Sequence, residues 1–170
     1  MERQEFTVHS ATVQDYNALC QLFREVDVLH QQHLPEVFQH AEGSVKEHDY
    51  FLNLIADDNV ALYLARLGQQ ITGFVHAAIQ ETPNVPIFVP RRYVVIVGIA
   101  VAAEYRDSGI GRVLMDHVHH WAFDKGARSI ELNVYEFNKG AIAFYERLGY
   151  QTLSRRLVKS LDVTSDDGRA

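Results

Sequence analysis

Apolar and polar residues recur along the chain with two different periods, which together predict a mixed succession of strands and helices. Runs dense in β-branched and aromatic residues predict six strands, at residues 6–10, 60–67, 71–81, 93–101, 130–134 and 150–161. Apolar residues at helical spacing predict four helices, near residues 12–29, 44–56, 110–125 and 138–148. This order indicates an α/β fold of the α+β kind, with a central mixed sheet covered by helices on both faces.

Short local signals mark the ends of the predicted helices. The capping and stop residues are Thr12 with Asp15, the capping box of Ser44 and Glu47, Lys125 with Gly126, and Gly149. Residues 30–43, around Pro35, and residues 82–90, with three prolines, are predicted to be loops. No repeat or linker divides the chain, so we expect a single domain over residues 1–161 and a disordered polar tail over residues 162–170.

The strand predicted at residues 93–101 differs from the others because polar residues do not alternate along it. Its sequence, Tyr-Val-Val-Ile-Val-Gly-Ile-Ala-Val, is typical of a central strand that is covered on both faces. Gly98 lies inside this run, where glycine indicates a β-bulge or the close approach of another backbone. We therefore expect an irregularity in the middle of the sheet.

A glycine-rich turn follows this strand and leads into the third predicted helix. It reads Arg106-Asp107-Ser108-Gly109-Ile110-Gly111, followed by Arg112. Glycines allow several backbone N–H groups to converge, and the helix N-terminus adds the positive end of a dipole. The two arginines can add charge-assisted hydrogen bonds. The turn is therefore predicted to bind phosphate. A P-loop is excluded because Gly111 is followed by Arg112 and Val113, and a dinucleotide fingerprint would come near the first strand.

Two segments together resemble the GNAT superfamily of N-acetyltransferases. Residues 94–115 resemble the acetyl-CoA-binding motif of that family, with the R-x-x-G-x-G turn at its centre. Residues 138–150, Asn-Lys-Gly-Ala-Ile-Ala-Phe-Tyr-Glu-Arg-Leu-Gly-Tyr, resemble its second signature, N-x-x-A-x-x-F-Y-x-x-x-G-F/Y. The motifs occur in the family's order with a strand between them. The resemblance covers residues 6–161, and its motifs lie in the last two-thirds of that range.

The resemblance implies an acetyl-CoA cradle in which the fourth and fifth strands splay apart at Gly98. The pantetheine arm would lie in the gap like an added strand, and a backbone N–H near Ile99 would stabilise the oxyanion. The implied acetyl-CoA-binding residues are Ile99, Ala100, Val101, Arg106, Asp107, Ser108, Gly109, Ile110, Gly111, Arg112, Asn138, Lys139, Ala141 and Tyr145.

The resemblance also implies a catalytic role for Tyr145, whose phenol could protonate the leaving thiolate as a general acid. Tyr145 also falls on the apolar stripe of its helix, where an aromatic ring would serve packing alone. The sequence does not decide which group is the general base, and the candidates are Glu81, His76 and a water molecule. Glu104 is expected to face solvent.

The acceptor is expected to be a primary amine of a small molecule or a peptide. In the family, the loop between the first two helices shapes the acceptor pocket, and here it contains His30 and His33. These two histidines could line that pocket or be solvated, and without a third ligand they do not predict a metal site. His117, His119 and His120 are interpreted as surface residues, and Tyr63 as a cross-strand packing residue.

Composition argues against several other classes of function. The net charge of −6 argues against a nucleic-acid partner, and no apolar run approaches the ~20 residues of a membrane span. One cysteine, Cys20, allows no internal disulfide, so we expect a cytoplasmic protein with Cys20 in its core. A homodimer is expected from the family alone. The alternatives are a CoA-binding regulatory domain without catalysis, and an acyltransferase with a different acyl donor or acceptor.

Overall fold

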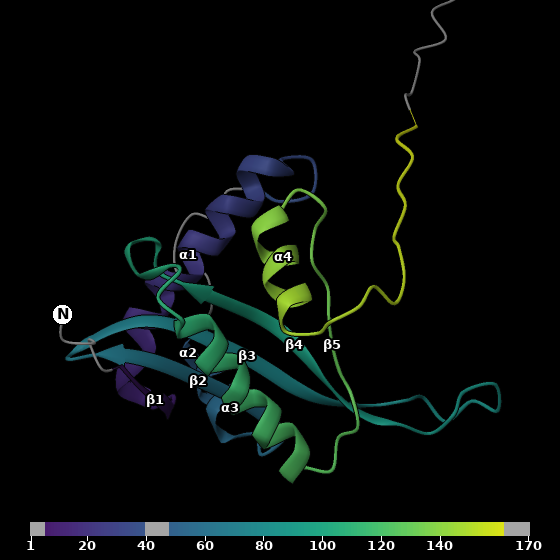
Figure 1. The fold of residues 1–170 in the computed structure, drawn as a ribbon, viewed down its shortest axis with the longest axis horizontal. Helices are drawn as coiled ribbons and strands as arrows, with labels where there is room; N and C mark the ends of the chain where they lie inside the picture. The colour runs from purple at the N-terminus through teal and green to yellow at the C-terminus, as the bar shows by residue number, and fades with distance from the viewer. Residues whose placement is uncertain (1–5, 40–47, 162–170) are drawn as a thin grey trace, which may run out of the picture. The chain divides into compact units, whose positions relative to one another are not determined.

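The structure is a computed structural model that describes residues 6–39 and 48–161 (Figure 1). In chain order its elements are β1 (Thr7–Ser10), the 3₁₀ turn η1 (Val13–Asp15), α1 (Tyr16–His33), α2 (His48–Ala56), β2 (Val60–Leu67), β3 (Gln70–Glu81), β4 (Arg92–Val101), the 3₁₀ turn η2 (Ala103–Tyr105), α3 (Ile110–Asp124), β5 (Ile130–Leu132) and α4 (Lys139–Arg147). The predicted capping box at residues 44–47 and the predicted tail at residues 162–170 lie outside the described residues. The chain forms two compact units, residues 1–137 and 138–170, so the single domain over residues 1–161 stays a prediction.

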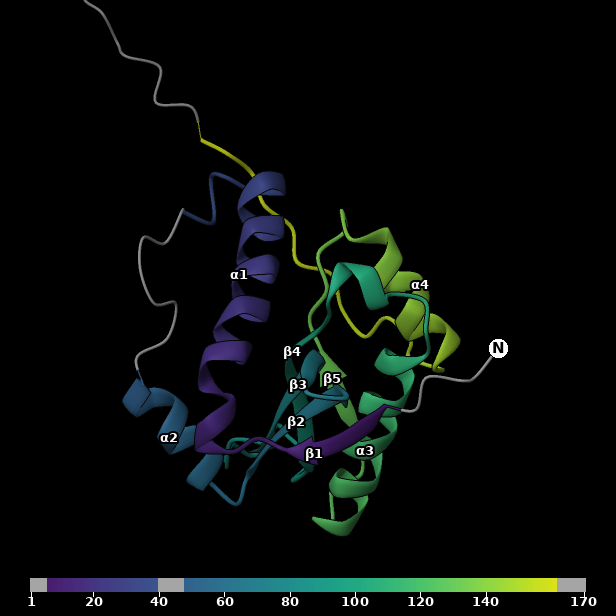
Figure 2. The same ribbon diagram turned by 90° about the vertical axis from the view of Figure 1, so that its left-hand side faces the viewer.

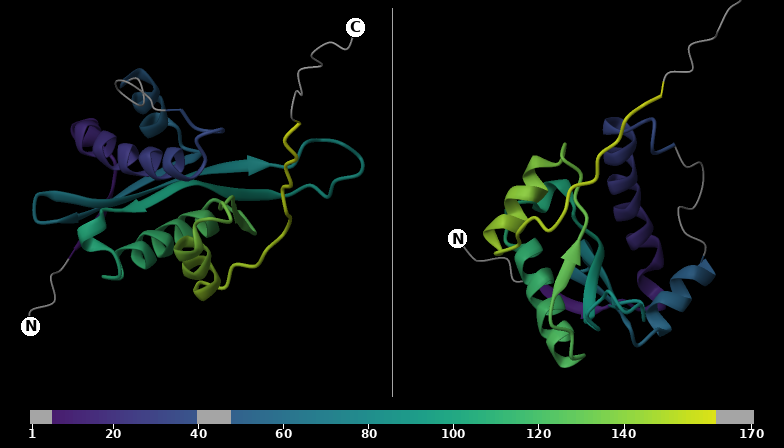
Figure 3. Two further views of the ribbon diagram at one scale, coloured as in Figure 1. Left: turned by 90° about the horizontal axis from the view of Figure 1, so that it is seen from above. Right: turned by 90° about the vertical axis from the view of Figure 1, so that its right-hand side faces the viewer.

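The first unit contains one mixed sheet with the strand order β1-β2-β3-β4-β5. All neighbouring strands are antiparallel except β4 and β5, which are parallel. Helices α1 and α2 cover one face of the sheet and α3 covers the other, as two perpendicular views show (Figures 2 and 3). The predicted fold class is thereby confirmed: a mixed sheet flanked by helices.

The core on the α1 face is built from alternate residues of the strands and the inward stripe of α1. Phe23 packs edge-on against Phe74 of β3, with 4.7 Å between ring centroids. The buried residues of this cluster are Leu19, Leu22, Phe23, Phe51, Leu62, Leu64, Phe74 and Ala102. On the opposite face, the buried side of α3 presents Ile110, Leu114, Met115 and Val118. Cys20 is buried, in agreement with its predicted place in the core.

Helix α1 begins as the sequence predicts but ends later. Asp15 is buried and accepts hydrogen bonds from the Thr12 amide at 2.9 Å and from Arg66 at 3.0 Å. Burial by itself raises the pKa of Asp15, but the bonds from Thr12 and the charges of His9 and Arg66 outweigh it and lower the pKa. The prediction that a loop begins at His30 was wrong, because α1 continues to His33. Its end fits the bias of Leu34, the residue before Pro35, away from helical conformation.

Strands β4 and β5 pair over only three positions. Val94, Val95 and Ile96 oppose Ile130, Glu131 and Leu132, and β4 continues beyond them with no β5 partner. The predicted splay between the fourth and fifth strands is therefore present. Strand β5 is also shorter than the predicted residues 130–134.

The second unit contains α4 and the segment that follows it. Asn138 caps α4, because its side-chain oxygen accepts a hydrogen bond from the Ala141 amide at 3.1 Å. Gly149, predicted as the stop, has a φ of 89°. The strand predicted at residues 150–161 was wrong, because no residue there is in a strand. Its apolar residues, Leu153, Leu157, Val158 and Leu161, do not alternate with polar ones, so one strand face could not bury them together.

Candidate functional site

The C-terminal half of β4 has an unpaired edge that begins at a β-bulge. His76 of β3 opposes Gly98 while Ala77 opposes Ile96, so Val97 is the extra residue. The Val97 side chain is 54% exposed, although its neighbour Ile96 is buried. The predicted irregularity in this strand is confirmed. A bulge bends a strand and increases its local twist, which accounts for the loss of β5 pairing just beyond it.

The register shows which backbone groups of β4 point toward this open edge. The Ala102 amide donates to the Thr72 carbonyl at 2.9 Å, so Ala102 directs its backbone groups toward β3. In an antiparallel ladder this direction alternates from residue to residue. Ala100 and Gly98 therefore also face β3, whereas Ile99 and Val101 direct their N–H and C=O groups away from it. Of the two carbonyls, that of Val101 accepts a hydrogen bond from Arg106 Nε at 3.1 Å.

The glycine-rich turn lies directly after this half-strand and presents a series of free amides. Gly109, at the start of α3, has a φ of 90°, and Asp107 has a φ of 60°. The Arg106 amide bonds to the Ala103 carbonyl, but the amides of residues 107–112 have no hydrogen-bond partner among the described residues. Successive N–H groups in alternating conformations form an anion-binding nest, and the dipole of α3 adds positive potential.

Gly73 fixes the position of this turn, a role that the sequence did not indicate. A Cβ at Gly73 would lie 2.8 Å from the Ala100 carbonyl oxygen and 3.3 Å from side-chain atoms of Ile110 and Val101. The absence of a side chain at Gly73 therefore allows the first residue of α3 to pack directly on the sheet beside the end of β4. Gly98 is not tight in this way, because its Cβ would be 3.6 Å from Phe74.

The side chains around the turn can complement an anion. Ser108 donates its hydroxyl proton to the Tyr105 carbonyl, which tightens the turn. Arg106 keeps its terminal guanidinium nitrogens for other partners, since only its Nε bonds within the described residues. Arg112 is exposed on the first turn of α3. The turn therefore carries six amides without a partner among the described residues and two arginines, all of them groups that can bind an anion.

The second unit holds the other predicted site residues, Asn138, Lys139, Ala141 and Tyr145. The Asn138 oxygen and the Ala141 amide bond to each other, which leaves the Asn138 NH₂ group as the available donor. Tyr145 is buried, and its ring lies 5.3 Å from that of Phe144 and 5.8 Å from that of Tyr150. Burial raises the pKa of Tyr145 to about 12. The phenol is therefore protonated at any physiological pH, as a proton donor must be.

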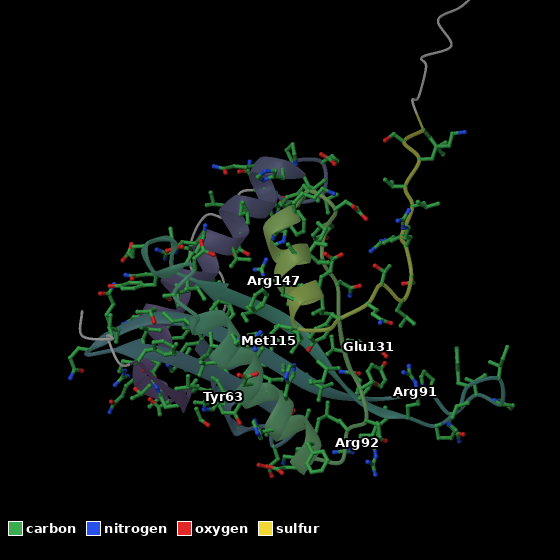
Figure 4. All side chains as sticks on the ribbon, in the orientation of Figure 1. Tyr63, Arg91, Arg92, Met115, Glu131 and Arg147 are labelled. Carbon is green, nitrogen blue, oxygen red and sulfur yellow. The ribbon has the colours of Figure 1, made fainter. Side chains whose placement is uncertain are left out.

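The two candidate bases on β3 have different surroundings. Glu81 forms an ion pair with Arg92 at 2.6 Å and lies five residues from His76, about 17 Å along the strand. Figure 4 shows Arg92 near the start of β4, with Arg91 and Glu131 beside it. His76 is buried opposite Gly98 at the bulge. Position along the sheet therefore favours His76 over Glu81. Glu104 is exposed, as expected.

An aromatic and histidine cluster joins the end of α1 to the segment that follows β5. Its rings are those of His30, His33, Phe38, Tyr135 and Phe137. His30 lies 5.1 Å from Phe38 and 5.5 Å from Tyr135, and His33 stacks on Phe137 at 4.3 Å. Among residues 6–39 and 48–161, no three histidine, cysteine or acidic side chains are grouped to hold a metal. The sequence did not indicate this cluster, because its members are about 100 residues apart in the chain.

A hollow lies against α3, on the side of β2. Its volume is about 400 Å³, and it is lined by Tyr63, Val113, Asp116, His117, His120, Trp121 and Asp124. Burial and the charge of Asp124 raise the pKa of Tyr63. Tyr63 therefore faces a surface hollow, whereas the sequence suggested cross-strand packing. The hollow is separate from the open edge of β4.

Comparisons with known proteins agree on one family. The model of the Acetyltransferase (GNAT) family matches residues 20–150. An N-acetyltransferase of Methanocaldococcus jannaschii is 32% identical over 60% of this chain and 44% of its own length. The thialysine N-epsilon-acetyltransferase of Bos taurus is 38% identical over 37% of each chain. The matched stretches thus span less than half of these relatives.

Solved structures show the same fold over nearly the whole chain. A protein from Bacillus halodurans is 25% identical and superposes with a TM-score of 0.87, over 91% of this chain and 99% of its own. The aminoglycoside N-acetyltransferase AAC(6')-Iy, solved in complex with CoA, is 16% identical and has a TM-score of 0.70, over 92% and 99%. Among the described residues, no helix has the length and apolar character needed to cross a bilayer.

Proposed function

The chain belongs to the Acetyltransferase (GNAT) family, and on that premise we propose that it transfers the acetyl group of acetyl-CoA to a primary amine. The relatives carry names that point to amine acceptors, such as thialysine, aminoglycosides and the alanine of ribosomal protein bS18. The observation that carries the proposal is the run of free amides at residues 107–112, next to outward N–H groups on β4.

The donor would bind in two places on the first unit. The amides of residues 107–112, with Arg106 and Arg112, would hold its diphosphate. The outward N–H groups of Ile99 and Val101 would bind its pantetheine arm at the open edge, as a strand adds to a sheet. The Ile99 N–H would then be placed to donate to the thioester oxygen as negative charge develops on it. Ala100 would contribute packing only, because its backbone faces β3 and it packs against the α1-face core.

The reaction is direct attack by the amine lone pair on the thioester carbonyl carbon. A C–N bond forms, the C–S bond breaks, and the sulfur leaves as a thiolate that needs a proton. We assign that proton to Tyr145. Because burial raises its pKa to about 12, the phenol carries its proton at neutral pH. Asn138 would bind the donor through its free NH₂ group, and Lys139 would lie near a phosphate.

Changing Tyr145 to Phe tests the general acid. The ring and its packing remain, so the affinity for CoA should change by less than about threefold while kcat falls by roughly a hundredfold. Calorimetry with CoA and a thiol-release assay measure the two quantities. Equal kcat in the two proteins would remove Tyr145 from the mechanism.

A matched pair of glycine variants tests the phosphate cradle. Gly109 and Gly68 both have positive φ, and a Cβ added at either would have no atom within 4 Å, but Gly68 lies in the β2–β3 turn. Both changes to Val place a side chain at a positive φ, which costs roughly 1–2 kcal/mol or more, but only Gly109→Val should weaken CoA binding, by at least about tenfold. Equal CoA affinity in both variants would contradict the cradle. CoA binding by the wild type without turnover on any amine would instead favour a regulatory domain.

A further inference from the structure

The aromatic and histidine cluster defined above lies on the α1 side of the open edge of β4. Tyr135 is three residues beyond Leu132, and Ile99 is three residues beyond Ile96, the partner of Leu132. Residues 133–135 are not in a strand, so Tyr135 follows the point at which β5 stops pairing with β4. The rings of His30 and Phe38, at and just after the end of α1, lie against Tyr135 there.

Helix α1 connects the cluster to the core beneath the unpaired half of β4. Phe23 of α1 packs on Phe74, which opposes Ala100 of β4. His30 follows Phe23 by seven residues, two helical turns, so it lies about 10 Å further along the helix on the same face. There it meets Tyr135 at 5.5 Å and Phe137 at 5.9 Å, both in the segment after β5. The cluster thus joins the two elements that border the opening.

His30 has a defined tautomer and a free ring nitrogen. Its Nδ1 lies 2.8 Å from the Val26 carbonyl oxygen, which can only accept, so Nδ1 carries the proton. In the neutral ring the other nitrogen, Nε2, is then a proton acceptor, and it has no partner among the described residues. The bond to Val26 and the rings of Phe38, Tyr135 and Phe137 hold the imidazole in one orientation. A fixed tautomer with a free Nε2 is what a general base requires.

We propose that His30 is the general base that removes a proton from the acceptor amine. The proposal rests on the proposed acetyl transfer. It names a residue for the role of general base, for which the sequence offered His76 and Glu81 of β3. An acceptor ammonium first loses one proton to His30 Nε2, which passes it to water. The neutral amine then attacks the thioester, and its second proton balances the one gained by the leaving thiolate. The products are the N-acetyl amine, CoA with its thiol, and one proton.

The surrounding rings add a preference for a cationic acceptor. The rings of Phe38, Tyr135 and Phe137 all lie within 5.9 Å of the His30 ring, and aromatic rings attract an ammonium group held over their faces. Within residues 26–39 and 133–137, the segments that supply the cluster, the other ionisable groups are those of Asp27, His33, Glu36, Tyr135 and Glu136. Three of these are carboxylates, which also favour the approach of a cation.

His33 supplies a matched control for the test. It lies on the same helix, and its Nδ1 also contacts a carbonyl four residues earlier, that of Leu29 at 2.9 Å. Its ring is exposed and stacks flat on Phe137, whereas the His30 ring is partly buried. His30→Gln and His33→Gln therefore remove equivalent imidazoles, and each glutamine can still donate to the carbonyl.

The experiment is kcat/KM against pH, from pH 5 to 9, for the wild type and both variants on an amine that the wild type acetylates. The wild-type rate should rise with pH and then level off, because a general base acts only in its unprotonated form. His30→Gln should lower kcat/KM about a hundredfold near pH 7 and lose the plateau, so that its rate keeps rising with pH. His33→Gln should stay within about threefold of the wild type.

Three further readouts separate the outcomes. CoA affinity within about threefold of the wild type shows that His30→Gln is folded, and added imidazole should restore His30→Ala in part. Equal profiles for the two glutamine variants, or no imidazole effect on a folded His30→Ala, would overturn the assignment. No wild-type turnover on any amine would instead refute the proposed acetyl transfer itself.

Discussion

The two halves of β4 are both apolar but have different neighbours. Residues 94–96 lie between β3 and β5, and the Val94 amide donates to the Ser129 carbonyl at 3.0 Å. Residues 98–101 pair with β3 alone, and the N–H groups of Ile99 and Val101 point into the gap. One bulged residue, Val97, separates the two halves. A strand can thus serve as core along half its length and present binding groups along the other half.

The largest expected effect comes from placing proline in each half. Ile99→Pro removes an N–H that bonds to no strand, so the protein should remain folded while kcat falls by about 10²–10³-fold, the usual effect of losing an oxyanion donor. Val94→Pro removes an N–H that bonds within the sheet, so it should lower the free energy of unfolding substantially. Urea denaturation and thiol release measure the two effects. A fully active Ile99→Pro would remove the proposed role of the open half.

This comparison shows how far the sequence predicts the site. The strand run, Gly98 and the turn at Gly109 are local signals, so the amino-acid sequence alone locates both the bulge and the turn. The free edge cannot be located in this way, because it depends on β5 ending at Leu132, which no local signal marks. The contribution of Gly73 is equally hidden in the sequence, since its neighbours Ala100 and Ile110 are distant along the chain.

The helix ends show the same division between local and distant causes. Thr12 and Asp15 are predictable at the start of the first helix because capping acts within one turn. The predicted end of α1 comes too early because His30 and His33 are polar and do not extend the apolar stripe. Pro35 marks the true end of the helix. The failed strand at residues 150–161 was predicted from composition, and its apolar residues lack the alternation that pairing requires.

A second pair of variants tests whether the open half depends on the packing of α3. Gly73→Val forces a Cβ to 2.8 Å from the Ala100 carbonyl and into Ile110, so it should cost about 1–3 kcal/mol and weaken CoA binding at least about tenfold. Gly98→Ala adds a methyl group in ordinary contact with Phe74 and should change each quantity much less. Calorimetry with CoA and urea denaturation measure both. If Gly98→Ala proved as damaging as Gly73→Val, the opening would depend on Gly98 itself.

A smaller effect is expected for the side chain that links the open half to the turn. Arg106 donates from Nε to the Val101 carbonyl, and its terminal guanidinium nitrogens remain available to a ligand. Arg106→Gln should weaken CoA binding about tenfold, as expected for one charge-assisted contact, with little change in stability. Raising the salt concentration should weaken binding to the wild type more than to the variant. An identical salt dependence in both would show that Arg106 does not contact the diphosphate.

The smallest effect is expected in the paired half, where an ion pair crosses from the start of β4 to β5. Arg91 Nη1 lies 2.9 Å from Glu131 Oε1, and both side chains are partly exposed (Figure 4). Exposed pairs contribute about 0.2–1 kcal/mol, because water screens the charges and ordering two long side chains costs entropy. A double-mutant cycle of Arg91→Ala and Glu131→Ala should therefore give a coupling energy below about 1 kcal/mol, falling with added salt.

The same cycle measured on CoA affinity should show no coupling, because the pair flanks residues 94–96 and not the open edge. If backbone pairing alone separates the two halves, breaking the ion pair leaves the gap unchanged. A coupling in CoA affinity of more than about tenfold would mean that side chains at the start of β4 set the width of the opening. The boundary at Val97 would then be a consequence of that ion pair and not of the bulge.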